Sequence, residues 1–167
     1  MELIKIKTWV VRIIMLFAII VMANLLSEVV IPSCLRYVSN EQSFDKVLMQ
    51  TADEINKITP YIVDEQTRLD SAIVLPNNTL QYNYTLIDEE LNFLIDMKLI
   101  DIDEFEEIFI EDADYGVKSW AINELKTNPS VKIFRDNKVT FVYNYRDING
   151  VFLTELTITP DQYNEFN

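Results

Sequence analysis

The sequence predicts an α+β domain, in which helices cover one face of a four-stranded antiparallel sheet, preceded by an N-terminal transmembrane helix. Three observations predict this architecture. They are two pairs of alternating strand-like runs, amphipathic helical patterns before and between the pairs, and a long apolar stretch that follows basic residues near the N-terminus. With 49% hydrophobic residues among 167, the chain can bury one core and hardly two. We therefore expect two parts, a cytoplasmic tip and anchor over residues 1–38 and an acidic folded domain over residues 39–167.

The apolar stretch near the N-terminus has the length of a membrane span. Trp9 to Ile31 covers 23 residues, about 34 Å as a helix, which matches a hydrocarbon core of about 30 Å. Lys5, Lys7 and Arg12 lie toward its N-terminal side, where the positive-inside rule places them in the cytoplasm. Residues 9–31 are thus expected to hold the chain in the lipid bilayer of a bacterial inner membrane, with the folded domain in the periplasm.

Two other interpretations of this N-terminus stay open. In the first, the segment is a signal peptide cleaved after residues 21–23, "VMA", which would leave a secreted or periplasmic domain. Apolar residues continue past this point to Ile31, which favours a retained anchor. In the second, Cys34 carries a lipid, although Pro32 stands where lipoprotein sites usually have a small residue.

The folded part begins with a helix and a pair of strands. Ser39 and Gln42 have the spacing of a capping box, and apolar residues then recur at helical spacing over residues 44–58. This apolar stripe predicts a helix that docks on the sheet. Two strand-like runs follow, "TRLDSAIVLP" and "NTLQYNYTLI", with the turn predicted at residues 76–78, "PNN".

Helices are predicted between this strand pair and the next. The stretch "DEELNFLIDMKLI" is compatible with either a helix or a continuation of the strand. Beyond it, Asp103 and Glu106 form another capping pattern that opens a helical apolar face, and the Asn-Pro pair at 128–129 ends this helix and can cap a short one. The second strand pair, "KVTFVYNYRD" and "VFLTELTITP", surrounds the Asn-Gly pair at 149–150, a strong hairpin signal.

The tripeptide Tyr-Asn-Tyr occurs twice, at residues 82–84 and 143–145, each time inside an alternating run. In both copies the tyrosines are in phase with the apolar residues of their strand, so we expect their rings in the core or at its rim, with wet hydroxyls. The asparagines are expected on the opposite, solvated face. A stacking platform for nucleic acid is less favoured, because it needs positive charge beside the rings.

The composition excludes several classes of chemistry. The chain has no histidine, one cysteine and two glycines, so it lacks the commonest general base, multi-cysteine metal sites and glycine-rich phosphate loops. A net charge of −13 disfavours nucleic acid, whose phosphates need clustered Lys and Arg. We accordingly predict that the protein is not an enzyme, binds no nucleic acid, and has no catalytic, cofactor-binding or metal-binding residues.

Two polar clusters have a structural explanation beside a functional one. Residues 101–114 hold eight carboxylates in fourteen positions, but the run keeps a helical pattern and lacks an EF-hand glycine, so a solvated acidic face is favoured over calcium binding. Such a face could guide a basic partner. Its side chains would be Glu104, Glu107, Glu111 and Asp114. Arg68 and Asp70, two apart on a strand, predict an ion pair with a structural role.

The segments "VDEQTRLDSAIVLPNNTLQYNYTL" and "FVYNYRDINGVFLTELTITP" together resemble a loose group of small bacterial envelope proteins, which have a signal or anchor and one compact α+β domain. The resemblance covers residues 63–160 and rests on the "TRLD" motif and the two tyrosine strands. Some members carry cysteines in the domain, which this chain lacks, so no disulfide is expected. The resemblance implies a compartment and a fold, and no activity.

These observations predict a membrane-anchored interaction or accessory protein that presents an acidic domain on the periplasmic side, as a subunit of an envelope complex. The alternative is a small exported binder of the immunity or inhibitor type, whose acidity complements a basic protein. In either case the expected partners are proteins, together with the lipid bilayer at residues 9–31 if the anchor is retained.

Overall fold

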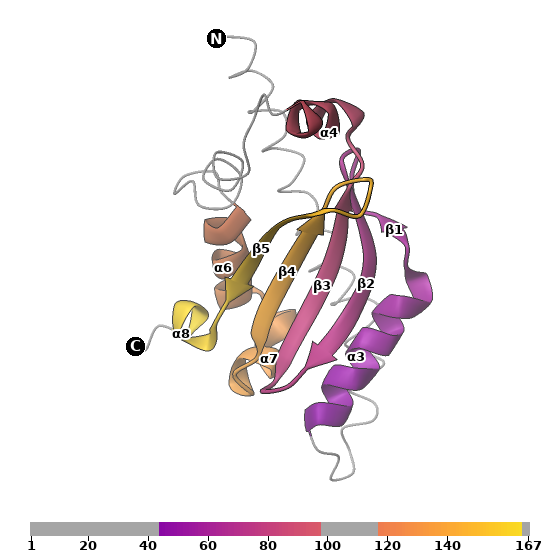
Figure 1. Ribbon diagram of the computed structural model, residues 1–167. Coiled ribbons are helices and arrows are strands. Elements are labelled where there is room, and N and C mark those ends of the chain that lie inside the picture. Colours follow the sequence, from indigo (N-terminus) through magenta and orange to yellow (C-terminus); the bar gives the residue numbers. More distant parts are fainter. Residues whose placement is uncertain (1–43, 98–116, 165–167) are drawn as a thin grey trace.

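The computed structural model describes residues 44–97 and 117–164. The described strands form one sheet in the order β1-β2-β3-β4-β5 (Figure 1), and they are β1 (Tyr61–Ile62), β2 (Thr67–Leu75), β3 (Thr79–Leu86), β4 (Thr140–Arg146) and β5 (Phe152–Ile158). The described helices are α3 (Phe44–Ile58), α4 (Glu89–Asp96), α6 (Val117–Thr127), the 3-10 turn η3 (Pro129–Val131), α7 (Lys132–Asp136) and α8 (Pro160–Tyr163).

The predicted α+β class is confirmed, and so are the two hairpins, because β2 pairs with β3 and β4 with β5 in antiparallel register. The predicted four-stranded antiparallel sheet is wrong in two respects. The short strand β1 adds a fifth strand, and β3 and β4 run parallel. A parallel pair requires the chain to return to the starting end of the sheet, and the long connection from Leu86 to Thr140 makes that return.

The turns of the two hairpins lie at the positions that the sequence predicted. Asn77 and Asn78 both have positive φ, 63° and 53°, a conformation that asparagine adopts more readily than other non-glycine residues. Gly150 has φ 83° in the β4–β5 turn, where a residue with a Cβ would be strained. Asn128 caps η3 by accepting the N–H of Ser130, as the Asn-Pro pair predicted. The ambiguous stretch after β3 begins with helix α4.

The helices α3, α6, α7 and α8 pack on one face of the sheet, which we call the covered face. Ring contacts show this arrangement, because Phe134 of α7 lies 6.1 Å from Phe141 of β4 and 6.4 Å from Phe44 of α3. Tyr163 of α8 lies 6.3 Å from the same Phe141 ring. Helix α3 docks as predicted, with its apolar stripe buried, and α6 joins the same core. We call the opposite face of the sheet the open face.

The two edges of the sheet differ in how their backbone groups are covered. On the β2 side, β1 pairs only with Arg68 and Leu69. Where β1 ends, the side-chain amide of Asn56 in α3 takes its place, because Asn56 Nδ2 donates to Ala72 O and Ala72 N–H donates to Asn56 Oδ1, both at 2.8 Å. A side chain thus satisfies backbone groups that an edge strand would otherwise expose. The β5 side has no such cover among the described residues.

None of the helices in residues 44–97 and 117–164 is both long and apolar enough to cross a bilayer. The predicted span over residues 9–31, the acidic run over residues 101–114 and the first capping box lie outside the described residues. The division into an anchor over 1–38 and a domain over 39–167 therefore stays a prediction.

Candidate functional site

The parallel pairing of β3 and β4 places the two Tyr-Asn-Tyr tripeptides side by side in register. Tyr82 pairs with Tyr143 and Tyr84 with Tyr145, so the four rings form a stacked cluster on the covered face, which we call the tyrosine ladder. The centroids lie 5.6 Å apart in the first pair and 5.3 Å apart in the second. No ladder residue is more than 6% exposed, which confirms that the rings belong to the core.

The prediction of wet hydroxyls is wrong for Tyr82. Its Oη is buried and has no hydrogen-bond partner among the described residues. Burial raises the pKa of all four phenols above the ordinary value of 10.0, because a phenolate would be desolvated there. The phenols therefore stay neutral at physiological pH, and the ladder offers neither a nucleophile nor a general base.

One carboxylate that acts on the ladder is Asp64, in the turn between β1 and β2, whose negative charge contributes to the raised pKa of Tyr84 and Tyr145. Its Oδ1 accepts the N–H of Gln66 at 2.7 Å, whereas its Oδ2 and the Oε1 of Gln66 are buried without a partner. Burial raises the pKa of Asp64. No group of three His, Cys, Asp or Glu residues within 44–97 and 117–164 could hold a metal ion. A single carboxyl among neutral phenols supplies no acid–base pair.

The orphaned hydroxyl of Tyr82 gives a direct test of this packing. We expect Tyr82→Phe to leave the free energy of unfolding unchanged or to raise it by up to about 1–2 kcal/mol, because the buried hydroxyl makes no hydrogen bond. The matched control is Tyr163→Phe, whose Oη donates to Val139 O at 2.5 Å, and which should lose about 1 kcal/mol. Urea unfolding of the full chain measures both. Equal losses for the two variants would contradict an unpartnered Tyr82 hydroxyl.

The open face carries the side chains that alternate with the ladder, and Figure 1 looks onto it, with α7 behind the strands. Asn83 Nδ2 donates to Ser71 Oγ at 2.9 Å, and Gln81 Nε2 donates to Asn83 Oδ1 at 2.7 Å. The asparagines thus point away from the ladder, as predicted, but Asn144 is only 8% exposed and therefore not solvated. Gln81, Asn83 and Ser71 thus form a hydrogen-bonded row across β3 and β2, and all three are half-buried.

The predicted ion pair of Arg68 and Asp70 is confirmed on this face. Arg68 Nε lies 2.5 Å from Asp70 Oδ1, and Asp70 Oδ2 also accepts the hydroxyl of Thr85 at 2.5 Å. Both partners are about one-third exposed, 37% and 32%, so the pair contributes little to stability, on the order of 0–1 kcal/mol. The contacts tie β2 to β3 and leave no free charge for catalysis.

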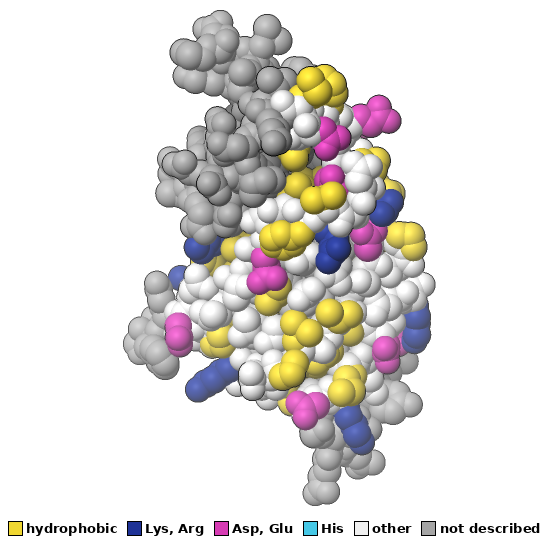
Figure 2. Space-filling model, viewed as in Figure 1, with side chains coloured by type: hydrophobic (Ala, Val, Ile, Leu, Met, Phe, Trp, Pro, Cys, Tyr) yellow, Lys and Arg dark blue, Asp and Glu magenta, His cyan; other side chains and the backbone are white. Residues whose placement is uncertain are grey.

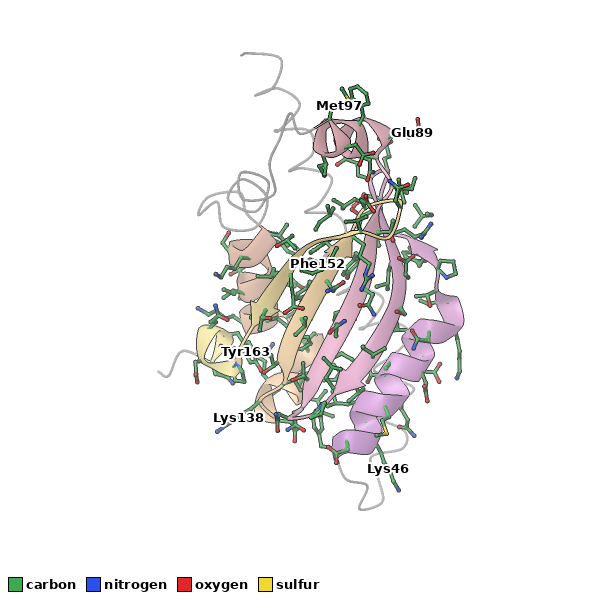
Figure 3. All side chains as sticks on the ribbon, viewed as in Figure 1. Lys46, Glu89, Met97, Lys138, Phe152 and Tyr163 are labelled. Carbon is green, nitrogen blue, oxygen red and sulfur yellow. The ribbon has the colours of Figure 1, made fainter. Side chains whose placement is uncertain are left out.

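Apolar side chains are exposed on the same side of the molecule. Ile73 of β2 is 40% exposed and Phe152 of β5 is 52% exposed, and Ile148 and Val151 in the β4–β5 turn are exposed as well. Figure 2 shows hydrophobic side chains over the middle of this face, with Lys, Arg, Asp and Glu around them. In Figure 3, Phe152 lies nearer the α4 end of the sheet, whereas Lys138 and Lys46 lie at the other end. An apolar centre with a polar rim is typical of a surface that binds another protein.

A comparison with family models identifies the family of this protein. Residues 42–152 match the family described as a domain of unknown function, DUF8479. The chain belongs to this family. Helix α3 and strands β1 to β4 of this DUF8479 domain lie inside the match, which ends at the first residue of β5. No curated protein matches the chain.

Two solved structures are similar to the DUF8479 chain. One is the Pseudomonas aeruginosa protein PA3611, described as a candidate secreted protein, with 12% identity, a TM-score of 0.51, and coverage of 75% of this chain and 98% of that one. The other is the Type II secretion system pilotin AspS from Vibrio cholerae, with 8% identity, a TM-score of 0.42, and coverage of 70% and 89%. The first likeness shows a shared fold. The predicted resemblance to small envelope proteins is confirmed only at this coarse level, as a family of unknown function with such a fold.

Sequence reasoning found the ladder residues and the Arg68–Asp70 pair but missed that the four ladder rings meet in register. The two identical tripeptides lie at equivalent positions of their strands. This repeat was the signal in the sequence that could have indicated that the two strands pair in register. The exposed apolar residues of the open face gave no signal, because Ile and Phe in a strand normally indicate core. The predicted acidic face of Glu104, Glu107, Glu111 and Asp114 lies outside the described residues, and the absence of catalytic, cofactor and metal residues stays a prediction.

Proposed function

We propose that this protein is a non-enzymatic interaction or accessory protein of the bacterial envelope, and that it binds its partner through the open face of the sheet. The observation that carries the proposal is the difference between the two faces. The covered face buries neutral tyrosines under helices, whereas the open face combines exposed Ile73 and Phe152 with a polar surround. Surfaces of this composition support protein binding.

We further propose that residues 9–31 hold the protein in the inner membrane, with residues 39–167 in the periplasm as part of an envelope complex. The length of the apolar segment and the basic residues before it support this arrangement. N-terminal sequencing of the protein from isolated membranes tests it. A mature chain starting at Asn24 would show signal cleavage and remove the anchor from the proposal.

Site-specific photo-crosslinking tests the binding face. We expect a photoreactive residue at Ile73, on the open face, to give an adduct of discrete mass with a protein of the membrane fraction. The control position is Met49 of α3, which is 56% exposed on the helical side and should give no such adduct. An equal adduct from Met49, or no adduct from Ile73 while the protein remains folded, would contradict the proposed face.

The second candidate, an exported binder of a basic protein, is favoured by one observation on charge. Residues 98–116 hold one basic and eight acidic side chains, 1 − 8 = −7, which is about half of the net charge of −13. Reversing Glu104 and Glu107 should slow association with a basic partner and weaken its salt dependence, because exposed charges act mainly on encounter. One soluble basic partner in co-purification supports this candidate, and a stable set of membrane proteins supports the first.

A further inference from the structure

The outer edge of β5 stands apart from the rest of the sheet. Six of its seven residues pair with β4 on one side, all but Leu153, and no hydrogen bond of the described part of the chain involves the backbone on the other side. An edge strand presents unpaired N–H and C=O groups, which proteins commonly guard with proline, lysine, a bulge or a covering helix. Phe152–Ile158, "FLTELTI", contains neither proline nor lysine, and its one irregularity, at Leu153, leaves Thr154 to Ile158 in continuous register with β4. Asn56 guards the β2 edge, and no side chain of residues 44–97 and 117–164 binds the β5 backbone in the same way.

We propose that β5 accepts an extended segment of a partner protein as an added strand, with a Lys or Arg of that segment opposite Glu155. This inference rests on the proposed function and specifies how the partner is held. Backbone hydrogen bonds along the edge would supply affinity, and side chains at alternate positions would supply specificity.

The side chains of β5 indicate the chemistry of the added segment. Glu155 is exposed, and its Oε1 accepts only the Thr157 hydroxyl at 3.2 Å within the described structure. An opposite charge directly across an antiparallel pair is favourable, and a like charge is not. Phe152 is 52% exposed and offers an apolar contact near one end of the strand. The fitting segment is therefore extended, rich in β-branched residues, and basic at its centre.

A second copy of the chain fits this edge less well. Glu155 is the central residue of β5, so the antiparallel register that pairs all seven residues of two copies would place Glu155 against Glu155. Such a like-charge pair is destabilising, and two chains of net charge −13 also repel one another. The charge of the edge thus favours a basic partner segment over self-association.

Two synthetic peptides test the inference on the full chain in detergent micelles. Both are blocked seven-residue peptides of alternating Thr and Val, one with Lys and one with Glu at the centre. In ¹⁵N-labelled protein we expect the Lys peptide to shift the amide signals of Phe152–Ile158 and to bind about two- to fivefold more tightly than the Glu peptide. Glu155→Lys should reverse this preference. The matched control is Asp53→Lys, an exposed acidic residue of α3, which should leave the preference unchanged.

Several results would overturn the inference. These are no shift up to the solubility limit of the peptides, shifts confined to other elements, or a preference that Glu155→Lys does not alter although its spectrum shows a folded domain. A dimer in sedimentation equilibrium with the β5 amides at its interface would replace the partner segment by a second copy. If Ile73 crosslinks a partner while the peptides fail, the added strand is excluded and the proposed function stands.

Discussion

Tyr84→Ala is expected to lower the free energy of unfolding by about 3–5 kcal/mol, extending to tyrosine the range observed for large aromatic truncations in cores. The ring is 3% exposed and lies in the middle of the tyrosine ladder. Its centroid is 5.3 Å from that of Tyr145 and 6.5 Å from that of Tyr143, and both pairs are nearly parallel. Truncation would leave a cavity between rings that have no room to collapse, and urea unfolding of the full chain measures the loss.

The control for this variant is Tyr84→Phe, which keeps the ring and removes only the hydroxyl. We expect it to change the free energy of unfolding by no more than about 1 kcal/mol. Should Tyr84→Ala instead keep its stability and abolish partner binding, the ladder would be a recognition surface, and its assignment to the core would be wrong.

Asn92→Ala is expected to cost about 2–4 kcal/mol, because one buried side chain satisfies three backbone groups. Asn92 Nδ2 donates to Leu86 O at 3.0 Å and to Asp88 O at 2.6 Å, and the N–H of Ile148 donates to Asn92 Oδ1 at 3.1 Å. The side chain is 4% exposed, so water would not readily replace it. The contacts connect α4, the end of β3 and the β4–β5 turn, and their loss should release α4 first.

Hydrogen exchange measures this local release separately from global unfolding. In Asn92→Ala, the amides of α4 and the N–H of Ile148 should exchange faster than those of the ladder strands. Asn123→Ala, on the exposed side of α6, is the matched control and should leave exchange in α4 unchanged. Unaltered exchange of α4 in Asn92→Ala would mean that other contacts hold the helix in place.

Local sequence signals predicted a large part of the fold. The phase of the tyrosines against their neighbours placed four rings in the core, and the turns at 76–78 and 149–150 set the two hairpins. The Asn-Pro pair at 128–129 predicted the N-terminal cap of η3, and the structure confirms it. Each of these features depends on residues a few positions apart, which is the range over which side-chain alternation and turn chemistry act.

Features that depend on distant parts of the chain escaped prediction. The choice between parallel and antiparallel pairing of β3 and β4 depends on the path of the connection between them and not on either strand. Burial of the Tyr82 hydroxyl follows from that choice, since it needs the rings of both strands to meet. Strand β1 has two residues, too few for an alternating pattern, and the exposed Ile73 and Phe152 look like core residues in the sequence.

The amide of Asn56 at the β2 edge also affects how a β-sheet assembly of this protein could grow. A sheet with two bare edges can pass strand pairing from one molecule to the next without limit, which is the geometry of a fibre. Here Asn56 already occupies the Ala72 backbone groups beside the short strand β1, so the β5 edge offers the longer run of free backbone groups in the described sheet. The unequal edges therefore favour the addition of a single strand at β5 over growth from molecule to molecule through both edges.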